Sequence, residues 1–298
     1  MARSGLLSYT ERSIALIRFA EMEAEKTTGI VYPIHLLLGL LKIRTETVAE
    51  LYINYPNLPD ILYDEVKKTK FDKGESGISY QPFFIPISET TKLVMEKAKE
   101  RMNHYGQVYL NEGYIIEAIC KVDECLTKAM LRRVDIDQIL HSVAYPRDMI
   151  VSLRDYSFPA ISVSKIILKK AKRSDAVELK SFVKGEFGEG WLTAIENGLS
   201  QDNIPIYLAW EDKQIMGFAC YDVVRKKKGL FGPMGISLLN RIQGIGYALL
   251  HYSLYEMKAK GYEYAVIGEA GPLEFYEKAC NAVVIPKKLK VTSFSNHN

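Results

Sequence analysis

An internal repeat is the feature that most constrains how the first half of this chain can fold. The stretch that begins at Thr10 returns 78 positions later at Ser88, and the same alignment places Leu37 on Ile115. In both copies, apolar residues recur every three or four positions, which is typical of amphipathic helices. Because such copies bury their apolar faces against each other, residues 1–145 are predicted to form one duplicated, all-α domain with its own core.

The pattern changes after residue 145. Residues 146–164 contain two prolines and mixed polarity, which predicts a linker. In residues 165–298, alternating segments such as "PIYLAWED" and "QIMGFACYDVV" predict strands, and segments such as "GWLTAIENGLSQ" predict helices. Interleaved strands and helices indicate a mixed sheet covered by helices. The expected fold class is therefore α+β with two domains, an all-α duplicated helical domain followed by a mixed α/β domain.

Composition argues against several classes of partner. The chain has 298 residues and a net charge of +3, which is too small to indicate nucleic acid or a membrane surface as a partner. Its longest apolar run, "IHLLLGLL", is far shorter than the roughly 18 residues that span a bilayer. The first residues lack the apolar core of a secretory signal, so we expect a cytoplasmic protein.

The cysteines indicate neither a disulfide framework nor a metal site. They form no C-x-x-C pair and have no zinc-like spacing with nearby histidines, so we expect reduced, packed thiols and no bound metal. The four are Cys120, Cys125, Cys220 and Cys280.

Two glycines, Gly244 and Gly246, stand where a polar turn becomes a long amphipathic stretch, in "NRIQGIGYALLHYSLYEMKAKGYEYAVIG". Each glycine costs a helix about 0.5 to 1 kcal/mol relative to alanine, so their presence needs a reason. The first N–H groups of a helix can hold phosphate where no side chain shields them. The spacing is R-x-x-G-x-G from Arg241, unlike the Rossmann and Walker A patterns. By itself the pattern is as typical of a tightly packed turn as of a phosphate-binding one.

The surrounding residues, "GPMGISLLNRIQGIGYALLHYSLYEMKAKGYEYAVIG…FYEKA", resemble the GCN5-related N-acetyltransferases. The resemblance covers nearly all of residues 165–298 and implies that acetyl-CoA is the co-substrate, with its diphosphate on the backbone of the glycine turn. It also implies that an amine acceptor attacks the thioester directly, with no cysteine nucleophile. The cofactor-binding residues that it implies are Met234, Ile236, Arg241, Gln243, Gly244, Ile245, Gly246 and Tyr247.

The same resemblance implies a catalytic role for Tyr276, which would donate a proton to the departing thiolate. This tyrosine stands in "FYEKA", where Cys280 and Asn281 replace the Gly-Phe that closes the family motif. A tyrosine that packs its ring is the alternative reading. The general base stays open, since the carboxylates expected at strand ends are several: Glu211, Asp222 and Glu269.

The repeat domain carries a resemblance of its own. "YTERS", "HLLLGLL" and "NEGYIIEAI" resemble the N-terminal domain of Clp ATPases over about residues 6–143, which implies that this domain recruits a protein or peptide partner. Glu112 is expected to line the peptide groove. No Walker A motif occurs, so we expect no ATPase module in these residues. Two functions follow: an N-acetyltransferase with a recruiting domain, or a catalytically silent, CoA-binding sensor or adaptor of the Clp protease system.

Overall fold

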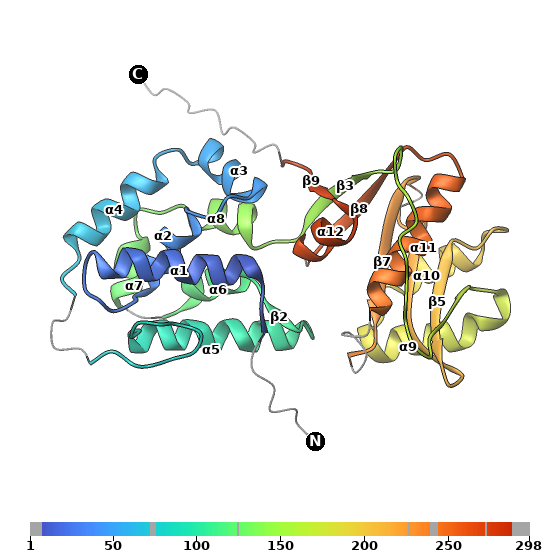
Figure 1. Ribbon diagram of the computed structural model, residues 1–298, viewed down its shortest axis with the longest axis horizontal. Helices are drawn as coiled ribbons and strands as arrows, with labels where there is room; N and C mark the ends of the chain where they lie inside the picture. Colours follow the sequence, from blue (N-terminus) through green and yellow to red (C-terminus); the bar gives the residue numbers. More distant parts are fainter. Residues whose placement is uncertain are drawn as a thin grey trace. The chain divides into compact units, whose positions relative to one another are not determined.

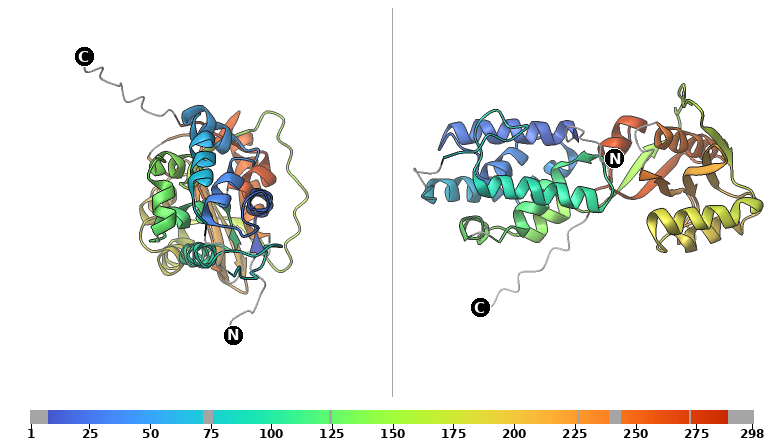
Figure 2. Two further views of the ribbon diagram at one scale, coloured as in Figure 1. Left: turned by 90° about the vertical axis from the view of Figure 1, so that its left-hand side faces the viewer. Right: turned by 90° about the horizontal axis from the view of Figure 1, so that it is seen from below.

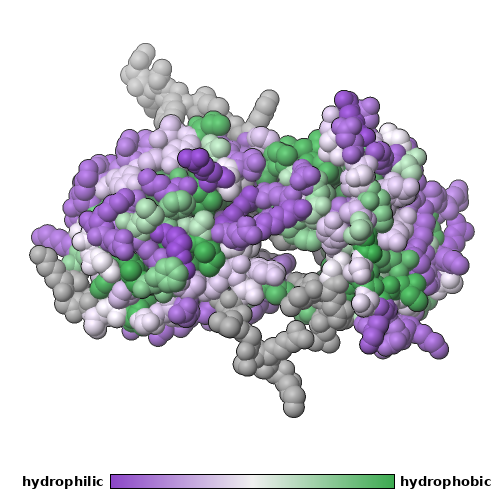
Figure 3. Space-filling model, in the orientation of Figure 1, coloured by the Kyte–Doolittle hydropathy of each residue, from purple (hydrophilic) through white to green (hydrophobic). Residues whose placement is uncertain are grey.

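The computed structural model describes residues 8–71, 76–123, 125–225, 227–238, 244–271 and 273–287. The chain forms two compact units that meet in sequence between Tyr145 and Pro146 (Figures 1 and 2). We call the first the helical unit and the second, Pro146–Ile285, the sheet unit. Hydrophilic side chains cover much of the visible face of both units (Figure 3), as expected where amphipathic elements bury their apolar faces.

The helical unit consists of helices and one short pair of strands. The helices are α1 (Glu11–Glu25), α2 (Pro33–Leu40), α3 (Glu46–Asn54), α4 (Leu58–Lys68), α5 (Glu89–His104), α6 (Glu112–Lys121), α7 (Cys125–Leu131) and α8 (Ile136–Val143). The strands β1 (Ser8–Tyr9) and β2 (Tyr109–Leu110) pair in parallel. No helix in the described part of the chain is long and apolar enough to cross a membrane.

The repeat predicted from the sequence is confirmed by the helix starts and their caps. Thr10 caps α1 by accepting the Ser13 N–H at 3.1 Å, and Ser88 caps α5 by accepting the Thr91 N–H at 3.1 Å. The capping residues of the two copies are thus the residues that the alignment superposes. Such a cap typically contributes about 1 kcal/mol to a helix.

The two copies are also tied to each other. The hydroxyl of Ser13 donates to the carbonyl of Leu110 at 2.7 Å, and the hydroxyl of Thr91 donates to the carbonyl of Val31 at 2.7 Å. In each case the first helix of one copy binds the backbone that precedes the second helix of the other. Neither copy can complete these bonds alone, so the helical unit is one interlocked core.

The sheet unit is built on a seven-stranded sheet in the order β4-β5-β6-β7-β8-β3-β9. The strands are β3 (Arg147–Ser152), β4 (Ile167–Lys170), β5 (Ile206–Glu211), β6 (Gln214–Tyr221), β7 (Leu230–Ile236), β8 (Tyr264–Ala270) and β9 (Val283–Val284). The helices are a 3-10 turn η1 (Arg173–Asp175), α9 (Ala176–Phe187), α10 (Leu192–Leu199), α11 (Ile245–Ala259) and α12 (Leu273–Cys280). The predicted mixed sheet covered by helices is confirmed.

Helices cover both faces of this sheet, as the right-hand view of Figure 2 shows. Alternate residues of β6 divide between the two cores, as the period of a strand requires. Phe218 and Cys220 pack with α9 and α10, whereas Ala219 and Tyr221 pack with α11 and α12. The two faces of the sheet are therefore covered by different helices, and a site between the strands can be reached from either face.

The predicted linker at residues 146–164 is wrong in its first part. Residues Arg147–Ser152 form β3, which lies between β8 and β9 and pairs antiparallel with both. Met149 and Val151 point into the core and are 0% and 2% exposed. Prolines at both ends of a short segment of mixed polarity made this strand look like a connector. What holds it in the sheet is pairing with residues more than a hundred positions away.

The rest of that segment, residues 153–166, crosses from β3 to β4 at the far edge of the sheet and can be followed as a green trace in Figure 1. It is held against α11 by side chains. The hydroxyl of Tyr156 lies 2.6 Å from Nδ1 of His251, and the ring of Phe158 packs edge-on against that of Tyr252. This connector is therefore anchored to α11 at Tyr156 and Phe158.

Candidate functional site

The neighbouring parallel strands β7 and β8 diverge partway along their length. Among the described residues they pair only at Leu230–Val266 and Phe231–Ile267. Beyond Phe231, β7 stays paired with β6 on its other side as far as Ile236. The β8-facing backbone of residues 232–235 is thus left without a strand partner in the described chain. Backbone N–H and C=O groups need hydrogen bonds, so this edge can pair with an extended ligand.

A β-bulge turns β7 away from β8. Its register with β6 shifts between the pair Ala219–Met234 and the pair Tyr221–Phe231, so β7 holds one residue more than β6 at this point. Gly232 lies in the extra stretch with φ of 118°, a conformation that favours glycine. Bulges bend a strand and increase its twist, which accounts for the divergence.

The helix that follows, α11, begins without a side-chain cap. Its N-cap residue is Gly244, with φ of 75° and ψ of 3°, and this left-handed conformation is strained for any residue with a Cβ. The N–H groups of Ile245, Gly246 and Tyr247 find no acceptor among the described residues. Such a helix end favours an anion through its free donors and the helix dipole.

Gly246 is needed for packing. A Cβ at this position would lie 2.7 Å from Cδ1 of Ile236 and 4.0 Å from Cε of Met234. The absence of a side chain lets the first turn of α11 approach the end of β7. The structure thus brings together three residues that the sequence assigned to one site, and it gives Gly246 a packing role there.

The remaining predicted cofactor-binding residues differ in which of their groups can contact a ligand. Ile245 is fully buried in the core, so only its N–H can face a ligand. Tyr247 is half-buried, with its ring centroid 4.2 Å from that of His251. Arg241 and Gln243 lie outside the described residues.

Tyr276 lies on α12 next to the point of divergence. It is 7% exposed, and its ring packs edge-on against Phe231, the last β7 residue that pairs with β8, with 6.4 Å between the centroids. Burial raises the pKa of its phenol, with a smaller contribution from Cys280. The hydroxyl therefore stays protonated over the working pH range, and geometry must offset its weaker acidity if it is a proton donor.

Two of the carboxylates considered as a base have other roles. Asp222 accepts hydrogen bonds from the Gly229 N–H and from the Tyr262 hydroxyl, both at 2.7 Å, and so holds the turn between β6 and β7. Glu269 lies 3.5 Å from Arg225 in an exposed ion pair. Glu211 ends β5 in the hairpin to β6.

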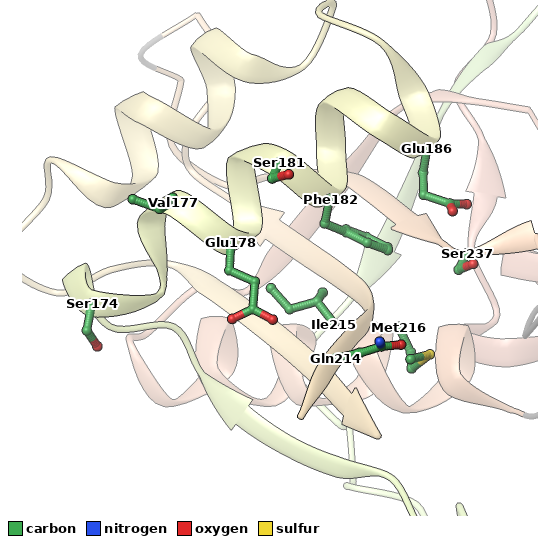
Figure 4. Close-up of a pocket in the computed structure, with 10 residues that line it drawn as sticks. All are labelled: Ser174, Val177, Glu178, Ser181, Phe182, Glu186, Gln214, Ile215, Met216 and Ser237. Atoms are coloured by element: carbon green, nitrogen blue, oxygen red, sulfur yellow. The ribbon is translucent and has the colours of Figure 1, made fainter. Parts of the chain in front are cut away.

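A groove of about 770 Å³ runs along α9 on the face of the sheet opposite to α11 (Figure 4). Its size is that of a small-molecule site. One end lies at Ser237, the residue directly after β7, and the carboxylate of Glu186 accepts the Leu238 N–H there at 3.2 Å. The residues used below are Glu178, Phe182, Glu186, Ile215, Met216 and Ser237.

Sequence reasoning missed this groove, although a signal was present. Glu178, Phe182 and Glu186 recur every four positions and so share one helical face. The reasoning also missed His251, which is 3% exposed on α11 and bonded to the connector through Tyr156. Burial lowers its pKa, so it stays neutral near pH 7.

In the helical unit, Glu112 is the first residue of α6. It is 9% exposed, and its carboxylate lies 3.8 Å from the guanidinium of Arg12. A peptide that uses Glu112 would meet a carboxylate that is already largely buried beside a positive charge.

Solved structures similar to this chain include members of two groups. One includes the N-terminal domain of the chaperone ClpD from Arabidopsis thaliana, which is 24% identical with a TM-score of 0.39 and covers 47% of this chain and 96% of its own. The Hsp104 N-terminal domain from Candida albicans is 17% identical, with a TM-score of 0.36 and coverage of 45% and 88%.

The other group includes a GCN5-related N-acetyltransferase from Sphaerobacter thermophilus, which is 21% identical with a TM-score of 0.39. The match covers 47% of this chain and 49% of that protein, so this chain spans about half its length. The similar structures thus include Clp N-terminal domains and GCN5-related acetyltransferases. No protein-family model matches the chain, and no curated protein is similar to it.

Proposed function

We propose that the sheet unit is an acyl-CoA-dependent N-acyltransferase, most simply an acetyltransferase that acts on an amine. One observation carries this proposal: β7 leaves β8 after Phe231, and the uncapped first turn of α11 lies against the end of β7. An open strand edge followed by free N–H groups suits a ligand that is extended and amide-bearing at one end and carries a diphosphate at the other. Coenzyme A has this chemistry.

The described residues would have the following roles in this reaction. The N–H groups of Ile245, Gly246 and Tyr247 would hold the diphosphate, and the backbone around Met234 would bind the amide-bearing arm. The bound thioester supplies an activated acyl carbon. An amine nitrogen bonds to that carbon, the carbon–sulfur bond breaks, and the amine loses its proton to solvent or a nearby base. Tyr276 would give its proton to the thiolate and regain one from solvent.

The helical unit would recruit a protein or peptide partner for this reaction. The alternative is a silent CoA-binding sensor or adaptor of the Clp protease system. The open groove beside the end of β7 favours the enzyme, because a sensor needs no site for an acceptor.

The test uses the full chain with acetyl-CoA and a panel of amines, and follows thiol release together with the mass of the acceptor. We expect amine-dependent thiol release and an acceptor heavier by one acetyl group. CoA binding in calorimetry without turnover on any amine would exclude the transferase and leave the sensor. Absence of CoA binding would exclude both.

A second prediction separates the packing role of Gly246 from its ligand role. Gly246→Ala places a Cβ against Cδ1 of Ile236, so we expect a loss of about 1 to 3 kcal/mol in the free energy of unfolding. Ile236→Val removes that Cδ1 atom. The double variant should regain most of the stability but stay at least about tenfold weaker in CoA affinity, because the Cβ still enters the space beside β7.

Thermal unfolding and calorimetry on the same samples check this prediction, with Ile236→Val alone as the control. If the double variant binds CoA as tightly as the Ile236→Val control, Gly246 serves packing only.

A further inference from the structure

The groove along α9 carries two carboxylates and no opposing charge of its own. Figure 4 shows Glu178 near its middle and Glu186 beside Ser237 at the end of β7. Glu178 makes no hydrogen bond or ion pair with any other described residue. No described residue that lines the groove is positively charged. The groove is therefore suited to a cationic ligand.

The lysines of α9 lie away from this face. Lys180 pairs with Glu196 at 3.4 Å, and Lys184 pairs with Glu189 at 2.7 Å. The lysines of α9 thus pair with carboxylates outside the groove. Glu178 has no partner among the described residues, and Glu186 accepts the Leu238 N–H.

Three apolar side chains contribute to the lining of the groove. Phe182 from α9, together with Ile215 and Met216 from β6, lines it between the two carboxylates. An alkyl chain fits such a lining, and an aromatic ring adds attraction for a cation nearby. The lining is therefore acidic at two points, with apolar side chains beside Ser181 and Gln214 in the rest of this stretch.

We propose that the acceptor is an extended amine with two positive charges joined by an alkyl chain, such as a linear diamine or polyamine. This inference rests on the proposed transferase function. The reacting amine would lie at the Glu186 end, next to Ser237 and β7, and lose its proton to attack. The second amine would keep its charge at Glu178. Eight helical positions separate the two carboxylates, which is about 12 Å along the axis.

The test compares linear diamines of increasing length with monoamines of the same chain length, in the full chain with acetyl-CoA. We expect kcat/KM to be about 3- to 10-fold higher for the longer diamines, which is the gain that a partly exposed ion pair and a neighbouring ring supply. Glu178→Gln should lower kcat/KM for the longer diamines by that same factor and so remove their preference over monoamines. Glu189→Gln, an equal charge change outside the groove, should retain the preference.

Equal use of monoamines and diamines by the native protein would overturn the inference, as would an equal loss on both in Glu178→Gln. Calorimetry of a long diamine with the CoA-bound chain gives a readout independent of turnover. If the native chain binds the diamine, Glu178→Gln weakens that binding and no amine causes thiol release, the diamine site is retained and the transferase is excluded. Absence of such binding would overturn the site.

Discussion

Replacing Tyr276 with phenylalanine is expected to lower kcat by about 10- to 10⁴-fold while leaving CoA affinity nearly unchanged. The substitution removes only the hydroxyl and keeps the ring that packs against Phe231. Because burial raises the pKa of this phenol, it stays protonated from about pH 6 to about pH 9. The loss should therefore be the same across that range.

Steady-state and single-turnover kinetics on an amine from the panel, with calorimetry for CoA, measure this effect. Tyr255→Phe is the matched control, since Tyr255 is 53% exposed on α11 and has no place in the proposed site. Turnover of Tyr276→Phe within about twofold of the native protein, with chemistry rate-limiting, would assign Tyr276 to packing alone.

Removing β3 is expected to abolish cooperative folding of the sheet unit. A chain of residues 165–298 lacks β3, so β8 loses one of its two neighbours and β9 loses the strand that joins it to the sheet. The core positions of Met149 and Val151 would be left empty, and an apolar strand edge would be exposed to aggregation. A chain of residues 146–298 keeps all of these contacts and should unfold in one transition.

Circular dichroism and thermal unfolding of the two chains decide this point. Residues 1–145 alone should be helical and fold cooperatively, because the two repeat copies complete each other's backbone bonds. Equal melting temperatures for the chains that start at 146 and 165 would show that β3 is dispensable.

The helical unit could be predicted well because its signals are local. A helix that starts at Thr10 or Ser88 is specified by the hydroxyl that caps it and by the apolar spacing that follows, all within one or two turns. In the sheet unit, most strands and helices could be predicted, but the order of the strands and the edges of the sheet could not. Alternating apolar residues show that a segment is a strand, but they do not show which strand it pairs with.

For the candidate site, the sequence by itself determined that a helix begins at the two glycines, because the amphipathic spacing that follows Gly244 is a local signal. Only the tertiary structure decided three things: that residues 147–152 complete the sheet, that Gly246 meets Ile236, and that Glu178 and Glu186 face an open groove. Each depends on contacts between residues far apart in the chain. Such contacts form only when the strands pair and the helices pack on the sheet, and no local pattern of residues specifies them.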